Sequence, residues 1–173
     1  MRRSMADRFR ARPRSGRIAI AFAALLALAL VAALAATVGR VAPADAAGPT
    51  PFPPVADSYV QADQAGTNYG AQTQIRADGM PVVRAYLRFN PQGLSGAVTN
   101  AVLRVRANSG QPETGYSVQG VASVTWGETS ITFSNAPPVS SPAYGPTGAF
   151  AAGTWNEVDV TPLVTGNGLV SMA

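Results

Sequence analysis

The stretch "AVLRVRA" at residues 101–107 decides the fold class, because apolar and charged side chains alternate along it. Leu103 and Val105 would lie on one side of an extended strand, with Arg104 and Arg106 on the other. The stretch "RAYLRF" at residues 84–89 alternates in the same way. A period of two over several residues predicts a half-buried β-strand.

The chain from residue 55 onward is made of short runs of this kind, broken by Gly, Pro, Asn and Ser. We expect strands at residues 57–62, 74–77, 83–90, 97–107, 116–121, 129–133, 156–160 and 169–172. No segment of this region repeats its apolar residues with the period of a helix. Short strands separated by turn residues predict an all-β domain, a β-sandwich of the jelly-roll type.

If strands 83–90 and 97–107 pair through the loop between them, their charged sides form one outward face. That face would carry one tyrosine and four arginines: Arg84, Tyr86, Arg88, Arg104 and Arg106. Like charges opposite each other destabilise a sheet, and an acidic polysaccharide would neutralise them through forked hydrogen bonds from arginine. The alternative is an ordinary solvent-facing surface on which arginine stems cover apolar groups.

Composition excludes several chemistries. The 173 residues include no Cys, His or Lys, so all 13 basic residues are arginines. A Ser-His-Asp triad, a thiol nucleophile, a disulfide and a Schiff base are therefore impossible within this chain. We expect no enzymatic activity of the domain itself. Binding of sugars or of a hard cation remains open, as does a carboxylate-driven glycosidase built on a pair such as Glu128 and Asp159.

The first 46 residues have the order of a secretory signal peptide: an arginine-rich start, an apolar stretch at residues 18–38 and the small-residue site Ala44-Asp45-Ala46. The alternative is an uncleaved membrane anchor, since the apolar stretch could span about 30 Å as a helix. Either way we expect export, with a proline-rich linker at residues 47–54. From residue 47 onward five arginines face seven carboxylates, so nucleic-acid binding is not expected.

Aromatic and acidic residues in loops supply further candidates. Tyr69, Trp126 and Trp155 could stack on sugar rings, or could pack over the ends of the sandwich. Calcium is the metal that the composition favours, through oxygens of Asp57, Asp63, Asn68, Asp78 or Asp159. Turn formation alone would also explain Asp and Asn at these places.

Six strings occur in an order that resembles one protein family. They are "ADSYV" (56–60), "TNYG" (67–70), "AYLRFN" (85–90), "VTNAVLRV" (98–105), "TWGETSITFSNAP" (125–137) and "GTWNEVDVT" (153–161). Together they resemble the DNRLRE-domain family, also called carbohydrate-binding module family 96, over nearly all of residues 56–173. The chain departs from the family pattern at Phe133, where the family tends to have Trp.

The resemblance implies a secreted jelly roll that binds polysaccharide, with acidic polymers such as alginate as the ligand class, and that accompanies a catalytic domain. The family pattern also runs on past Ala173, so we expect the domain at residues 55–173 to lack its last strand and to leave a sheet edge unpaired. A different class of function, a structural spacer or adhesion module without glycan affinity, would use the same fold.

Overall fold

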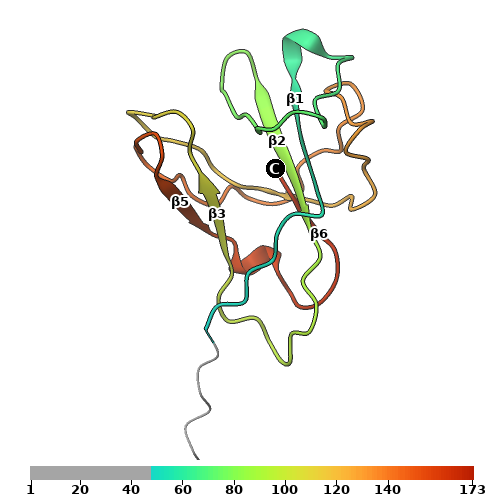
Figure 1. Cartoon of the computed structure of the whole chain (residues 1–173). Coiled ribbons are helices and arrows are strands. Elements are labelled where there is room, and N and C mark those ends of the chain that lie inside the picture. Colours follow the sequence, from blue (N-terminus) through green and yellow to red (C-terminus); the bar gives the residue numbers. More distant parts are fainter. Residues whose placement is uncertain (1–47) are drawn as a thin grey trace, which may run out of the picture. The chain divides into compact units, whose positions relative to one another are not determined.

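The computed structural model describes residues 48–173, so the predicted signal peptide at residues 1–46 lies outside the described part (Figure 1). The strands are β1 (Ala56–Gln61), β2 (Val83–Phe89), β3 (Val102–Arg106), β4 (Gly120–Val121), β5 (Trp155–Asp159) and β6 (Val170–Met172). Two 3-10 turns follow β1 and β5: η1 (Ala62–Gln64) and η2 (Thr161–Leu163). The described region holds no α-helix, which confirms the all-β prediction.

Residues 48–54 carry no secondary structure, in agreement with the run of prolines there. Among the described residues, no helix is long and apolar enough to cross a bilayer.

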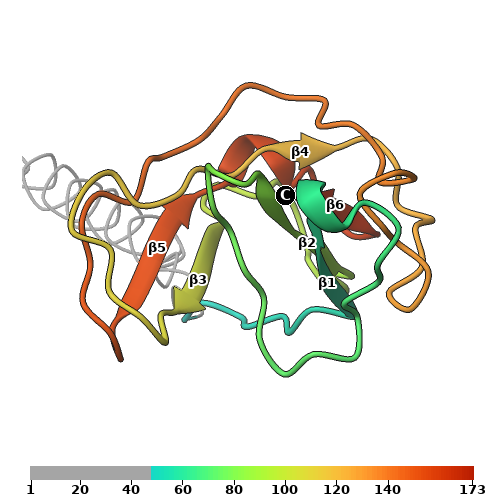
Figure 2. The ribbon, with the colours of Figure 1, turned by 90° about the horizontal axis from the view of Figure 1, so that it is seen from above.

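The strands form two antiparallel sheets (Figure 2). The larger has the order β1-β2-β6-β4, and the smaller consists of β3 and β5. The predicted pairing of β2 with β3 is therefore wrong. β2 pairs with β1 and β6, with Leu87 opposite Met172, whereas β3 pairs with β5, with Arg104 opposite Glu157.

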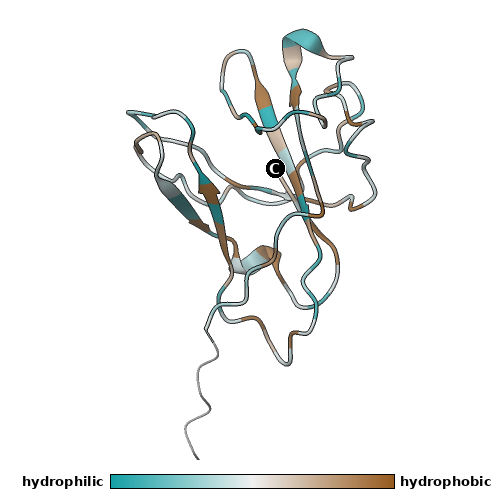
Figure 3. Cartoon of the chain, viewed as in Figure 1, coloured by the Kyte–Doolittle hydropathy of each residue, from teal (hydrophilic) through white to brown (hydrophobic). Residues whose placement is uncertain are grey.

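The reason lies in the core between the two sheets. Leu87 and Met172 of the larger sheet pack in one buried cluster with Leu103 and Val158 of the smaller sheet. The apolar sides of β2 and β3 thus face each other across a sandwich, so these strands cannot also lie side by side in one sheet. Figure 3 shows that β3 and β5 carry both hydrophilic and hydrophobic residues, as expected for strands with one buried side.

The other face of the larger sheet is buried too. Tyr86, with 1% of its surface exposed, packs there against Val60, Trp126 and Ile131. Leu87, its neighbour in the chain, lies in the core between the sheets. β2 is consequently covered on both sides, and the prediction that Tyr86 faces solvent is wrong. Alternation identified two sides of the strand correctly, but it could not reveal that a distant loop covers the polar one.

Two of the expected strands are absent from the described structure. Residues 74–77 form no ladder, although Ile75 still packs on the core. Residues 129–133 form turns, because Gly127 O accepts the N–H groups of Ser130 and Ile131. The Asn135 side chain adds to this by accepting from Thr132 N and donating to Ser130 O. Such local bonds compete with a sheet ladder for the same backbone groups.

Candidate functional site

The outward side of the smaller sheet is an exposed surface that carries aromatic, basic and acidic side chains. Along β3 and β5, every second residue is exposed to solvent. We call this surface the β3–β5 face; its residues are Val102, Arg104, Arg106, Trp155, Glu157 and Asp159. The intervening residues Leu103 and Val158 point into the core and fix the orientation of the face.

Arg104 is a cation of the β3–β5 face whose guanidinium is held in place by two neighbouring side chains. Its Nε lies 2.7 Å from Glu157 Oε1 on the neighbouring strand, and both side chains are 57% exposed. Its Cζ also lies 5.1 Å from the centroid of the Trp155 ring, within the range of a cation–π contact. A carboxylate and an aromatic ring thus restrain the guanidinium, while its Nη groups make no hydrogen bond within residues 48–173.

Trp155 is 58% exposed, which is unusual for so large an apolar side chain. It lies directly opposite Arg106, whose Nε donates to Gly153 O at 3.4 Å. At the far end of the face, Val102 lies opposite Asp159. Hydrogen bonds from the Thr161 side chain and backbone N–H hold the pKa of Asp159 below its usual value, so this carboxylate is ionised at neutral pH.

This arrangement supplies the three elements of a sugar-binding surface. The exposed indole offers an apolar platform for the flat side of a pyranose ring. The guanidinium groups of Arg104 and Arg106 donate hydrogen bonds, and the carboxylates of Glu157 and Asp159 accept them from hydroxyls.

The structure separates the residues of the predicted arginine face. Arg104 and Arg106 lie on the smaller sheet, whereas Arg84, Tyr86 and Arg88 lie on the larger one. Arg88 Nη1 donates to Val124 O (3.0 Å) and to Trp126 O (2.6 Å). The Arg88 guanidinium thus binds the loop that contains Val124 and Trp126 to the larger sheet. Of these three residues on the larger sheet, Arg84 is the one whose side chain is exposed to solvent.

The two predicted loop aromatics also pack within the fold. Trp126 is 7% exposed, and its indole N–H donates to Ser171 Oγ at 3.1 Å. Tyr69 stacks on Tyr59 with ring centroids 4.3 Å apart, and Arg76 lies over the Tyr59 ring. The contacts of Tyr69 with Tyr59 and of Trp126 with Ser171 hold loops against the larger sheet. A glycan-binding role of Tyr69 and Trp126 stays a prediction.

The predicted calcium ligands are spread over the domain. Within residues 48–173 no three carboxylates come together as a metal-binding group. Asn68 Nδ2 donates to the carbonyls of Glu128 (2.8 Å) and Ile131 (2.7 Å), while its Oδ1 accepts from Gly70 N. Asn68 therefore joins two loops, and a side chain at Gly70 would collide with the Glu128 carbonyl. Calcium binding by Asp57, Asp63, Asn68 and Asp159 stays a prediction.

Asp57 is a second acid whose surroundings shift its pKa. Partial burial and the nearby charge of Glu128 raise its pKa above the usual value. Its backbone N–H donates to Glu128 Oε2 at 3.3 Å. Because β1 is an edge strand, this bond occupies an N–H group that would otherwise be open to another strand.

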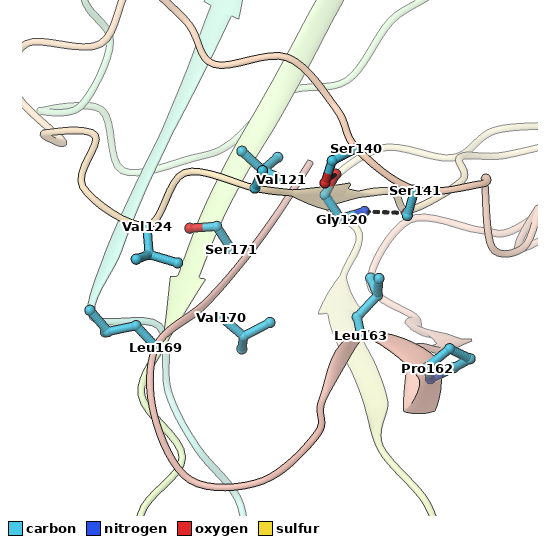
Figure 4. A pocket seen from close by; sticks show the side chains of 11 residues that line it. Gly120, Val121, Val124, Ser140, Ser141, Pro162, Leu163, Leu169, Val170 and Ser171 are labelled. Carbon is cyan, nitrogen blue, oxygen red and sulfur yellow. Dashed lines mark hydrogen bonds between the residues drawn. The ribbon is translucent and has the colours of Figure 1, made fainter.

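A pocket of about 280 Å³ opens beside β4 and β6, but its lining offers little chemistry (Figure 4). Apolar and small residues surround it, among them Val121, Leu163 and Val170. Two of its serine hydroxyls are already bonded: Ser171 Oγ accepts from the Trp126 indole and Ser141 Oγ from Gly120 N. We therefore place the candidate site on the β3–β5 face.

Sequence reasoning left Trp155 undecided and did not include Glu157 in the site. A signal for both was present in residues 155–159, "WNEVD", where Trp155, Glu157 and Asp159 alternate with Asn156 and Val158. Alternation places the first three on one side of the strand. That this side also carries Arg104 and Arg106 depends on the pairing of β3 with β5, which no local pattern encodes.

An exposed aromatic ring flanked by arginine and carboxylate groups can stack on a sugar ring and exchange hydrogen bonds with its hydroxyls. The family model of carbohydrate-binding module family 96 matches residues 48–173. The chain belongs to this family, which confirms the resemblance drawn from the six strings. No curated protein matches the chain.

Proposed function

We propose that this domain binds a uronate-containing polysaccharide on the β3–β5 face, without catalysing a reaction on it. Membership of a family of carbohydrate-binding modules supports the general activity. The observation that carries the site is the exposure of Trp155 beside the restrained guanidinium of Arg104. The open part of the indole offers an apolar platform, and the neighbouring guanidinium offers hydrogen-bond donors to a sugar stacked on it.

The hydrogen-bond donors of the β3–β5 face indicate which class of ligand it binds. Arg106 makes no ion pair within the described residues and lies opposite Trp155, so an acidic group on a stacked sugar could pair with it. We further propose that the leader at residues 1–46 directs export, and that the domain holds a catalytic domain of the same protein near its substrate. The signal-like order of residues 1–46 and the resemblance of the strings support these two steps.

Affinity electrophoresis in gels containing soluble polysaccharides, alginate among them, tests the proposal with Trp155→Ala. We expect the substitution to weaken binding at least about tenfold, since truncating a central aromatic contact typically costs about 2 kcal/mol. Met80→Ala is the matched control, because Met80 is 89% exposed on the loop before β2. It should leave the affinity unchanged.

Two outcomes would contradict the proposal. Retardation of the Trp155→Ala variant equal to that of the unmodified chain would remove the β3–β5 face as the site. A chain that no polysaccharide in the panel retards would instead favour a structural spacer.

A further inference from the structure

The charges of the β3–β5 face are distributed unevenly along its strands. The cross-strand pairs follow one another in the order Arg106–Trp155, Arg104–Glu157 and Val102–Asp159. The first pair carries a positive charge, the second is neutralised by its own salt bridge, and the third carries a negative charge. A ligand lying along the strands therefore meets a cationic, a neutral and an anionic position in turn.

We propose that the β3–β5 face binds a polysaccharide in which acidic sugars are separated by uncharged ones. One uronate lies at the Arg106–Trp155 end, and uncharged sugars lie along Arg104–Glu157 and Val102–Asp159. This inference rests on the proposed function, and it specifies which anionic polymers the same site accepts.

The cationic end fits an acidic sugar. Arg106 uses its Nε for Gly153 O and makes no ion pair within residues 48–173, so its Nη groups can donate to a carboxylate. The exposed Trp155 ring lies directly opposite on β5 and supports the sugar that carries this carboxylate.

The remaining positions fit uncharged sugars. Glu157 already balances Arg104, so a second carboxylate there would compete with an existing ion pair. Asp159 is an exposed carboxylate that is ionised at neutral pH and would repel a uronate, whereas it can accept hydrogen bonds from sugar hydroxyls. Residues 155 and 159 are about 13 Å apart along a strand, so an extended glycan on Trp155 reaches Asp159 within a few sugar units.

The test compares three polymers in affinity gels run with the full chain. Polygalacturonate carries a carboxylate on every sugar, hyaluronan alternates glucuronate with an uncharged sugar, and hydroxyethyl cellulose is uncharged. At equal uronate concentration we expect hyaluronan to retard the chain at least severalfold more strongly than polygalacturonate. We expect hydroxyethyl cellulose to bind more weakly than hyaluronan.

Two variants locate the selectivity. Asp159→Asn removes the negative end while keeping an oxygen for Thr161 N, and should raise the affinity for polygalacturonate severalfold relative to the affinity for hyaluronan. Arg106→Gln should lower the affinity for hyaluronan toward that for hydroxyethyl cellulose. Asp63→Asn, an exposed carboxylate in η1, is the charge-matched control and should change neither.

The outcomes separate this inference from the proposed function. Tighter binding to polygalacturonate than to hyaluronan, with no effect of Asp159→Asn, would overturn the alternating-charge ligand and leave glycan binding intact. Equal binding of all three polymers, lost in Trp155→Ala, would likewise overturn it. Failure of every polymer to retard the chain would overturn the proposed function and this inference with it.

Discussion

Arg88 illustrates how the same side chain type can serve different purposes a short distance apart. Its guanidinium lies 5.1 Å from the centroid of the Trp126 ring, as the Arg104 guanidinium does from Trp155. Trp126 is buried and Trp155 is exposed. The pair of Arg88 and Trp126 therefore packs at the edge of a core, whereas the pair of Arg104 and Trp155 lies at the solvent. Composition cannot distinguish the two arginines, because the distinction depends on which loop covers which sheet face.

Removing the Arg88 guanidinium should therefore weaken the fold and leave the sugar site intact. Arg88→Met would leave the carbonyls of Val124 and Trp126 without their donor. We expect the free energy of unfolding to fall by about 3 kcal/mol, the lower end for two hydrogen bonds from a charged donor at about 1.5–3 kcal/mol each, because the methionine side chain retains much of the packing of the arginine stem. Urea denaturation measures the change.

Arg106→Gln serves as the control for stability, because Arg106 is exposed and makes one long hydrogen bond. It should shift the free energy of unfolding by no more than about 0.5 kcal/mol. If Arg88→Met abolished glycan binding at unchanged stability, Arg88 would be a ligand contact, as the sequence pattern predicted.

At the scale of elements, the segment at residues 121–139 covers the outer side of the larger sheet. Alternation along the strands of that sheet could not predict this cover. This segment contributes Trp126 and Ile131 to a second core, in which they pack with Val60, Tyr86 and Val121 of the larger sheet. Alternation in residues 101–107 correctly separated inward from outward side chains, because that information is local. Strand partners and loop cover depend on contacts between distant residues, and the pairing of β2 with β3 was wrong for that reason.

The same segment brings Glu128 beside Asp57 on β1, and this contact makes stability depend on pH. Burial and then the Glu128 charge raise the pKa of Asp57 above its unfolded value of about 3.8. In the window between these two values the folded state holds more protons than the unfolded state. The contribution of Asp57 therefore becomes less favourable as pH rises through that window.

Asp57→Asn should consequently stabilise the domain at neutral pH. We expect the free energy of unfolding at pH 7 to rise by up to about 1 kcal/mol, the scale of a like-charge pair in a sheet. At a pH below 3.8 the advantage should vanish, because Asp57 is then protonated in both states. Urea titrations of variant and parent at both pH values give the comparison, and a variant less stable at pH 7 would refute it.

The whole domain carries more acidic than basic residues, which limits how it can hold an anionic polymer. From residue 47 onward the net formal charge is −2, and within the described residues Arg88 and Arg104 are already engaged with the protein. A polymer bound through a wide basic patch would be released steeply by salt. Here a single guanidinium, that of Arg106, would act beside the aromatic ring of Trp155.

Binding should accordingly depend on salt only moderately. Raising NaCl from about 0.05 M to about 0.5 M shortens the electrostatic screening length to roughly a third of its value, and this weakens the contact between Arg106 and an acidic sugar. Contact with the indole ring is apolar and persists. We expect the affinity for an alternating acidic polysaccharide to fall severalfold, and Trp155→Ala to remain about tenfold weaker than the parent at both salt concentrations. Isothermal titration calorimetry at the two concentrations measures both quantities. A loss of all binding at high salt in the parent would mean that charge alone holds the polymer, and the exposed ring would then need another explanation.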